Sequence, residues 1–214
     1  MADRSGKRKS RAQLSKRRVP TLGYYIIVTD TKETERNYML GLRDSIPAEM
    51  QGKLVIKVSK AGLTNLVDEA LEMASLIPQY GEPWIIFDRD EVKGFDQIIA
   101  QAKENGVRVG WSNPCFETWL GAYFGEMSAS QNSMVCCDKF GEAFLRKTGQ
   151  EYSKSDGDIY SKLCRFGDEK KAISIAKRKL GEHERNGKVN PSEMNPATTV
   201  HVLVEEIQGK VRSE

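Results

Sequence analysis

The sequence is short of histidine, since His183 and His201 are the only two in 214 residues. Zinc sites built on imidazole and Ser-His-Asp catalysis therefore have little material to draw on. A glycine-rich phosphate loop of the Walker type is missing too, so we do not expect the chain to hydrolyse ATP by itself. No apolar run approaches the roughly 20 residues that cross a bilayer, and no membrane partner is expected.

The four cysteines do not have the spacing of a metal site. Cys136 and Cys137 are adjacent and cannot easily pair with each other, and no two cysteines have the two-residue gap of a zinc knuckle. The sequence therefore predicts reduced thiols in a reducing compartment. The basic, polar start lacks the apolar segment of a secretory signal, so a cytoplasmic protein is expected.

Positive charge is concentrated at the start of the chain. Residues 1–18 carry eight basic side chains and one acidic one, although the net charge of the whole chain is only +3. Such a tail is expected to be disordered by itself, and it could contact phosphates or simply improve solubility. We predict three parts: a basic tail at 1–20, an α/β core at 21–125 and a helical C-terminal extension packed on the core at 126–214.

Apolar, β-rich runs alternate with helical patterns after Pro20. The runs predict strands at 24–28, 54–58, 84–87 and 107–111. Helical spacing predicts helices at 34–42, 64–77, 94–105, 114–124, 139–147, 159–166, 169–180 and 202–207. This alternation predicts an α/β fold with a mostly parallel sheet flanked by helices, followed by a helical C-terminal portion.

Acidic side chains follow two of the predicted strands directly. Asp30 comes just after the first strand, and Asp88 and Asp90 follow the third. Ligands of parallel sheets bind beyond the carboxyl ends of the strands. Mg²⁺ or Mn²⁺ needs only a few protein carboxylates there, because such a cation keeps several waters. The alternative is a solvated turn in which Asp88 caps a helix and Asp90 pairs with Arg89.

Three further residues could belong to the same site. Asn113 follows the fourth predicted strand. Glu117 lies one turn further on, where it could bind metal, orient a basic group or simply suit the helix dipole. Lys154 lies between two serines and could bind phosphate, although a plain polar loop explains the same segment. Arg89 and Asn113 are the other candidates for contact with phosphate or nucleic acid.

Four segments, in this order, resemble the RloB family, which is known from bacterial abortive-infection loci. They are Val28–Tyr38, Phe87–Asp90, Ser112–Trp119 and Asn195–His201. The first resembles a loop that usually reads Glu-Gly-x-x-Thr-Glu-x-Asn-Tyr, the second an Asp-x-Asp strand end, and the third an Asn-Pro-x-x-Glu-x-Trp segment. The resemblance spans roughly residues 24–207.

The resemblance implies a Toprim/Rossmann-like fold and a Mg²⁺- or Mn²⁺-dependent nuclease that cleaves RNA, tRNA or DNA. It also implies antiphage defence with an ABC/SMC-type ATPase encoded nearby, and a homo-oligomer is possible. The metal ligands carried over are Asp30, Asp88 and Asp90. The implied catalytic residues are Asp30, Glu35, Asp88, Asp90 and Glu117.

The chain departs from the family pattern in its first motif. Asp30 stands where the family has glutamate, and Thr31 stands where it has glycine. Aspartate is one methylene shorter, so its reach differs, and Glu33 or Glu35 could compensate. This departure favours an alternative function, in which the chain is a non-catalytic binding or effector subunit of the ATPase complex.

Overall fold

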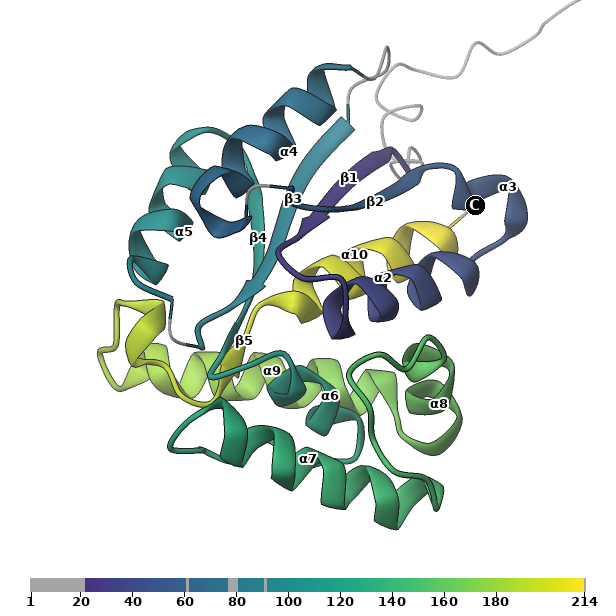
Figure 1. Cartoon of the computed structure of the whole chain (residues 1–214), viewed down its shortest axis with the longest axis vertical. Coiled ribbons are helices and arrows are strands. Elements are labelled where there is room, and N and C mark those ends of the chain that lie inside the picture. Colours follow the sequence, from purple (N-terminus) through teal and green to yellow (C-terminus); the bar gives the residue numbers. More distant parts are fainter. Residues whose placement is uncertain (1–21, 61, 77–80, 91, 214) are drawn as a thin grey trace, which may run out of the picture.

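The computed structural model describes residues 22–60, 62–76, 81–90 and 92–213 (Figure 1). Within these residues, five strands form one sheet in the order β2-β1-β3-β4-β5. The strands are β1 (Tyr24–Thr29), β2 (Leu54–Val58), β3 (Gly81–Asp88), β4 (Arg108–Asn113) and β5 (Ala197–Thr198). The first four run parallel to their neighbours, and only β5 is antiparallel. The predicted mostly parallel α/β fold is therefore confirmed, while the tail at 1–20 lies outside the described residues.

The helices fall between and after the strands. Those between strands β1 and β4 are α2 (Thr34–Asp44), α3 (Ala48–Gln51), the short 3₁₀ helix η1 (Gly62–Asn65), α4 (Leu66–Ser75) and α5 (Phe95–Glu104). Those after β4 are α6 (Glu117–Tyr123), α7 (Ser133–Thr148), α8 (Ile159–Phe166), α9 (Glu169–Arg185), the 3₁₀ helix η2 (Pro191–Glu193) and α10 (Val200–Val211). No helix in the described part of the chain is long and apolar enough to cross a membrane.

Helices cover both faces of the sheet (Figure 1). Helices α2 and α10 lie on one face, and α4 and α5 lie on the other. Successive side chains of β1 divide between the two apolar clusters, with Tyr25 and Ile27 in the first and Ile26 and Val28 in the second. Because both faces are buried, the strand is a continuous apolar run in the sequence.

The chain returns to the sheet after α6 to α9. Strand β5 pairs with the end of β4, bringing Thr198 opposite Ser112 and Ala197 opposite Asn113. This strand was not predicted, because two residues are too few for a periodic pattern and its partner is far away in the sequence. The proposed boundary between core and extension stays a prediction, although both β5 and α10 pack on the sheet.

Two helices begin three or more residues from their predicted starts. Helix α6 begins at Glu117 and not at Pro114, which lies in the turn after β4. Helix α7 begins at Ser133, well before the predicted start at 139, because the Asn132 side chain caps it. The Asn132 Oδ1 atom accepts a hydrogen bond from the Val135 amide at 2.9 Å.

The strand order reverses between β1 and β3. The chain moves from β1 outward to β2, and then crosses back to β3 on the other side of β1. At such a point the loops after the two central strands lead apart, which leaves room for a ligand at the carboxyl ends. Asp30 follows β1 and Asp88 ends β3, so both lie at this point.

Candidate functional site

A cavity of about 360 Å³ lies where the chain leaves β1 and β3. Its lining is dominated by acidic side chains, and Lys154 is the single lysine that the described residues contribute to it. The residues predicted as catalytic all contribute to it, and so does the predicted phosphate ligand: Asp30, Glu35, Asp88, Asp90, Glu117 and Lys154. The structure thus brings together side chains that are spread over more than 120 positions of the sequence. Their catalytic roles stay predictions.

Each acid is positioned by the end of a secondary-structure element. Asp30 is held beside β3 by its amide, which donates to the Ile86 carbonyl oxygen at 3.3 Å. Glu35 lies in the first turn of α2, and Glu117 is the first residue of α6. Helix N-termini favour negative charge, so both glutamates can be tolerated at low exposure. Their exposed fractions are 5% and 2%.

Glu35 takes the position that could compensate for the short Asp30. Its Oε2 atom accepts a hydrogen bond from the Thr31 hydroxyl, and its charge contributes to raising the pKa of Asp30. Thr31, which replaces the glycine of the resembled motif, therefore has a defined partner. Glu33 also lines the cavity but is exposed. Of the two candidates, Glu35 is the one buried with Asp30.

If all the carboxyl groups of this cavity were ionised, they would repel one another at low solvent exposure, and the pKa values of three of them are raised as a result. Burial, followed by the Glu35 charge, raises the pKa of Asp30 to about 7. Burial and the charges of Glu35, Asp30 and Glu117 raise the pKa of Asp88 to about 9. Burial also raises the pKa of Glu35. Without a cation, the site therefore holds protons near neutral pH.

Asp30 and Asp88 differ in how well their oxygens are satisfied. Asp88 Oδ2 accepts a hydrogen bond at 3.3 Å from the amide of Phe116, the residue just before α6. Among the described residues, Asp30 Oδ1 is buried without a hydrogen-bond partner. A buried carboxylate oxygen without a donor is costly, and a bound cation would satisfy it.

Asp90 is held in an unusual backbone conformation. Its φ is 27°, in the left-handed region, and its amide donates to the Pro114 carbonyl oxygen at 2.8 Å. Such strain persists only where surrounding contacts enforce it. The pairing with Arg89 that the solvated-turn alternative offered takes a different form, because Arg89 Nη1 donates to the backbone oxygen of Asp90 at 3.4 Å.

The three predicted phosphate contacts are not equivalent. Lys154 lines the acidic cavity and also a neighbouring one of about 700 Å³, which Arg89 and Asn113 line as well. The Asn113 side-chain nitrogen already donates to the carbonyl oxygens of Pro191 and Ser192, each at 3.1 Å. Lys154 and Arg89 are thus better placed than Asn113 to meet an anion.

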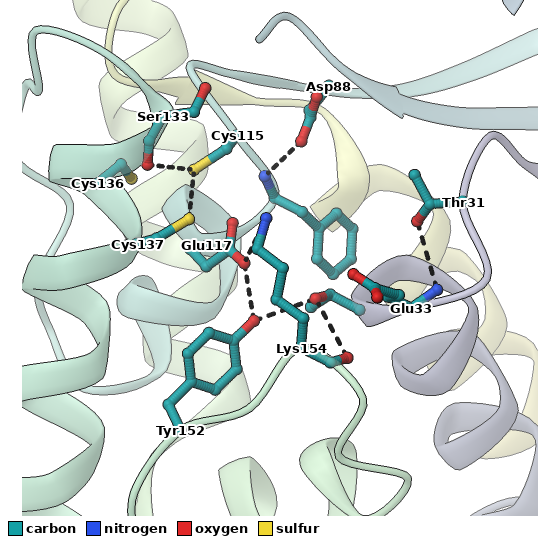
Figure 2. A network of polar contacts seen from close by, with 12 residues as sticks. Thr31, Glu33, Asp88, Cys115, Glu117, Ser133, Cys136, Cys137, Tyr152 and Lys154 are labelled. Carbon is teal, nitrogen blue, oxygen red and sulfur yellow. Dashed lines mark hydrogen bonds and ion pairs between the residues drawn. The ribbon is translucent and has the colours of Figure 1, made fainter.

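The carboxylates share a cavity but do not converge on one point. Within the described residues, the only three potential ligand side chains whose donor atoms lie within 4.8 Å of one another are Cys115, Glu117 and Cys137. Sequence reasoning missed this second cluster, shown in Figure 2. The cysteines are 22 positions apart, so no local spacing could have indicated it.

The fold and cavity define an α/β protein with a carboxylate-rich site at the switch point of a mostly parallel sheet. The chain belongs to the RloB-like protein family, whose family model matches residues 25–207. Searches of curated proteins and of solved structures each returned no significant match. The family resemblance predicted from the motifs is therefore confirmed.

Proposed function

We propose that the protein is a metal-dependent nuclease that hydrolyses phosphodiester bonds in RNA, tRNA or DNA. The observation that carries the proposal is that six carboxylates of the described residues and Lys154 line one cavity at the switch point of the sheet. A role in antiphage defence, together with an ABC/SMC-type ATPase, follows from the family resemblance. The Toprim-like character of the site is part of the same proposal.

The residues fit a hydrated hard cation. The donors are carboxylate oxygens, and Asp30 Oδ1 lacks a partner in the described structure. No three carboxylate oxygens from different described side chains lie within 4.8 Å of one another, so a bound cation would need side-chain movement or waters to complete its shell. Asp30 and Asp88 are the proposed ligands, with Asp90 beside them. When bound, Mg²⁺ or Mn²⁺ would polarise the phosphate and lower the pKa of a water.

The remaining side chains would handle protons and the nucleic acid backbone. Glu35 is buried beside Asp30, and this burial raises its pKa above the ordinary carboxyl value, which suits a group that accepts or returns a proton. Lys154 lies at the rim, where its ammonium group would contact a phosphate oxygen. Arg89 Nε, which has no hydrogen-bond partner among the described residues, could hold the adjacent phosphate.

The direct test is cleavage of RNA, tRNA, single-stranded DNA and duplex DNA with Mg²⁺ or Mn²⁺, with and without the ATPase encoded nearby. The Asp88→Ala/Asp90→Ala variant is expected to lose cleavage by at least about a thousandfold, since it removes two charges from the metal site. The surface variant Asp68→Ala, on α4, should cleave like the wild type. Equal cleavage by the wild type and the double variant would refute the proposal.

One observation favours the non-catalytic alternative: the carboxylates do not converge within ligand distance in the described structure. A binding subunit would need the ATPase but not the acids. If the Asp88→Ala/Asp90→Ala variant gave full protection against phage and still bound the ATPase, the chain would act as a binding or effector subunit.

A further inference from the structure

Three cysteines, Cys115, Cys136 and Cys137, gather beside Glu117 (Figure 2). Cys115 lies just before α6, and Cys136 and Cys137 belong to the first turns of α7. The sulfur atoms of Cys115 and Cys137 are 4.0 Å apart. Cys136 points to the Thr118 hydroxyl, with 3.5 Å between Sγ and Oγ1. The pair formed by Cys115 and Cys137 therefore stands next to the Glu117 carboxylate.

The spacing of this pair matches that of two ligands on one tetrahedral ion. Zn–S bonds of about 2.3 Å put two sulfur atoms of a tetrahedron about 3.8 Å apart. The observed 4.0 Å is close to this edge, and a Glu117 oxygen lies within 4.8 Å of both sulfur atoms. A small movement of the side chains would suffice to bring the three donors onto one ion.

Glu117 is oriented from behind by two other side chains. The Tyr152 hydroxyl donates to Glu117 Oε1 at 2.7 Å, and Lys154 Nζ lies 3.9 Å from the same atom. Supporting contacts of this kind fix the direction of a ligand carboxylate. They also balance charge: two thiolates and a carboxylate around a divalent cation leave one negative charge, which the ammonium group of Lys154 offsets.

An ion could reach the cluster from solvent. Cys115 is buried with an exposed fraction of 1%, whereas Cys137 is only partly buried. Cys137 lines the cavity of about 700 Å³ that also contains Asp90, and a second cavity of about 650 Å³ beside α7. The cluster is therefore covered on the Cys115 side and open on the Cys137 side.

We propose that Cys115, Glu117 and Cys137 form a binding site for Zn²⁺ or a similar borderline-soft divalent cation, with the fourth position left to water. Binding releases one proton from each of the two thiols to solvent, and no oxidation state changes. Two sulfur donors and one carboxylate are a donor set that suits Zn²⁺ better than Mg²⁺.

The site would be connected to the acidic cavity through Glu117, which lines both. An ion on the sulfur side draws on the carboxylate that also faces Asp88. Zn²⁺ bound there would therefore compete with a cation in the acidic cavity. The metal-binding proposal itself does not depend on the proposed nuclease activity.

The test uses the full chain, reduced and stripped of metal, titrated with Co²⁺ and then with Zn²⁺. We expect a thiolate-to-cobalt charge-transfer band at one Co²⁺ per chain, which Zn²⁺ displaces. Cys115→Ser and Cys137→Ser should each weaken binding at least about a hundredfold, because even the loss of a supporting group costs about 10- to 100-fold. Cys164→Ser, on the exposed face of α8, should bind like the wild type.

Alkylation of the wild type, read by mass spectrometry, keeps the test independent of whether the variants fold. Zn²⁺ should protect Cys115 and Cys137 and leave the labelling rate of Cys164 unchanged. The proposal is overturned if no charge-transfer band forms, if the Cys115→Ser/Cys137→Ser variant keeps the wild-type affinity, or if Zn²⁺ fails to protect the two thiols. Loss of nuclease activity has no bearing on these readouts, so the two proposals fail separately.

Discussion

On one side of Glu117, the oxygens of Asp30, Glu35 and Asp88 line an open cavity. On its other side, the sulfur atoms of Cys115 and Cys137 lie within 4.8 Å of each other and of a Glu117 oxygen. The first pocket offers hard donors that suit Mg²⁺, and the second offers soft donors that suit Zn²⁺. The two pockets share a residue, yet they differ in the chemistry of their donors and in how closely the donors approach one another.

The difference in the spacing of the donor atoms indicates how each pocket would bind a cation. The carboxylates repel one another and remain apart, so a cation there keeps waters that a phosphate can replace. The sulfur pair is already close to the geometry of a bound ion, because the turn before α6 holds Cys115 and the start of α7 holds Cys137. The acidic pocket is suited to exchange of ligands, whereas the thiol pocket is suited to retention of an ion.

Among single substitutions, the broadest effect is expected from Glu117→Ala, because this residue belongs to both pockets. Mg²⁺-dependent cleavage and Co²⁺ affinity should each fall by at least about a hundredfold. Both are measured on the same preparation, with Glu104→Ala at the exposed end of α5 as the control. A variant that loses one property and keeps the other would mean that the two pockets do not share this carboxylate.

The stability of the metal-free protein should fall as pH rises. The pKa values of Asp30 and Asp88 are raised from 3.8 to about 7 and about 9, so the folded state binds protons that the unfolded state lacks in that interval. The contribution of these two groups to the free energy of unfolding therefore decreases as pH rises from 3.8 and becomes constant above about 9. Thermal unfolding in EDTA measures this slope, and saturating Mg²⁺ should flatten it.

The Asp30→Asn/Asp88→Asn variant provides the matched control for that slope, since it keeps the shape of both side chains and removes their titration. Its thermal midpoint in EDTA should depend much less on pH than that of the wild type. A wild-type midpoint that rises with pH over the same interval would contradict the assignment of these two groups.

Asp88→Asn alone should stabilise the metal-free protein at neutral pH, because the wild-type carboxyl, with its pKa raised to about 9, must take up a proton when the chain folds and the amide does not. The gain is on the order of 1–3 kcal/mol, or about 3–10 °C in Tm for a chain of this size. Mg²⁺ should then no longer raise Tm. Asp68→Asn on α4 is the surface control, and equal responses of the two variants would argue against charge repulsion in the cavity.

The smallest effect is expected from Tyr152→Phe, which removes the hydroxyl that orients Glu117. Its ring packs edge-to-face on Phe140, with centroids 4.7 Å apart, and a phenylalanine keeps that contact. Co²⁺ affinity should fall about tenfold with little change in Tm. Tyr24→Phe at the far end of β1 is the control. An unchanged affinity would mean that the hydroxyl does not support the ligand.

Local sequence patterns predicted most elements but not their ends. The apolar run ending at Asp88 predicted β3, because a strand buried on both faces leaves such a run. The start of α7 was missed, since the cap at Asn132 is decided by one hydrogen bond. Strand β5 was missed because its pairing with β4 joins residues far apart in the chain.

The residues of the candidate site also fall into those that local sequence patterns predict and those that they do not. The Asp88-Arg89-Asp90 motif and Glu117 could be selected from the sequence, because acids directly after strands or at helix starts gather at one edge of a parallel sheet. Which glutamate accompanies Asp30 could not be selected, since Glu33 and Glu35 differ only in which face of the α2 start they occupy. Burial beside Asp30 distinguishes Glu35.

The sequence by itself determined the alternation of strands and helices, the family and the acids at the strand ends, because each depends on residues close together in the chain. Only the tertiary structure decided that Cys115 and Cys137 meet beside Glu117 and that six carboxylates of the described residues share one cavity. The physical reason is that donor groups converge through the packing of α6, α7 and the sheet, which no local pattern encodes.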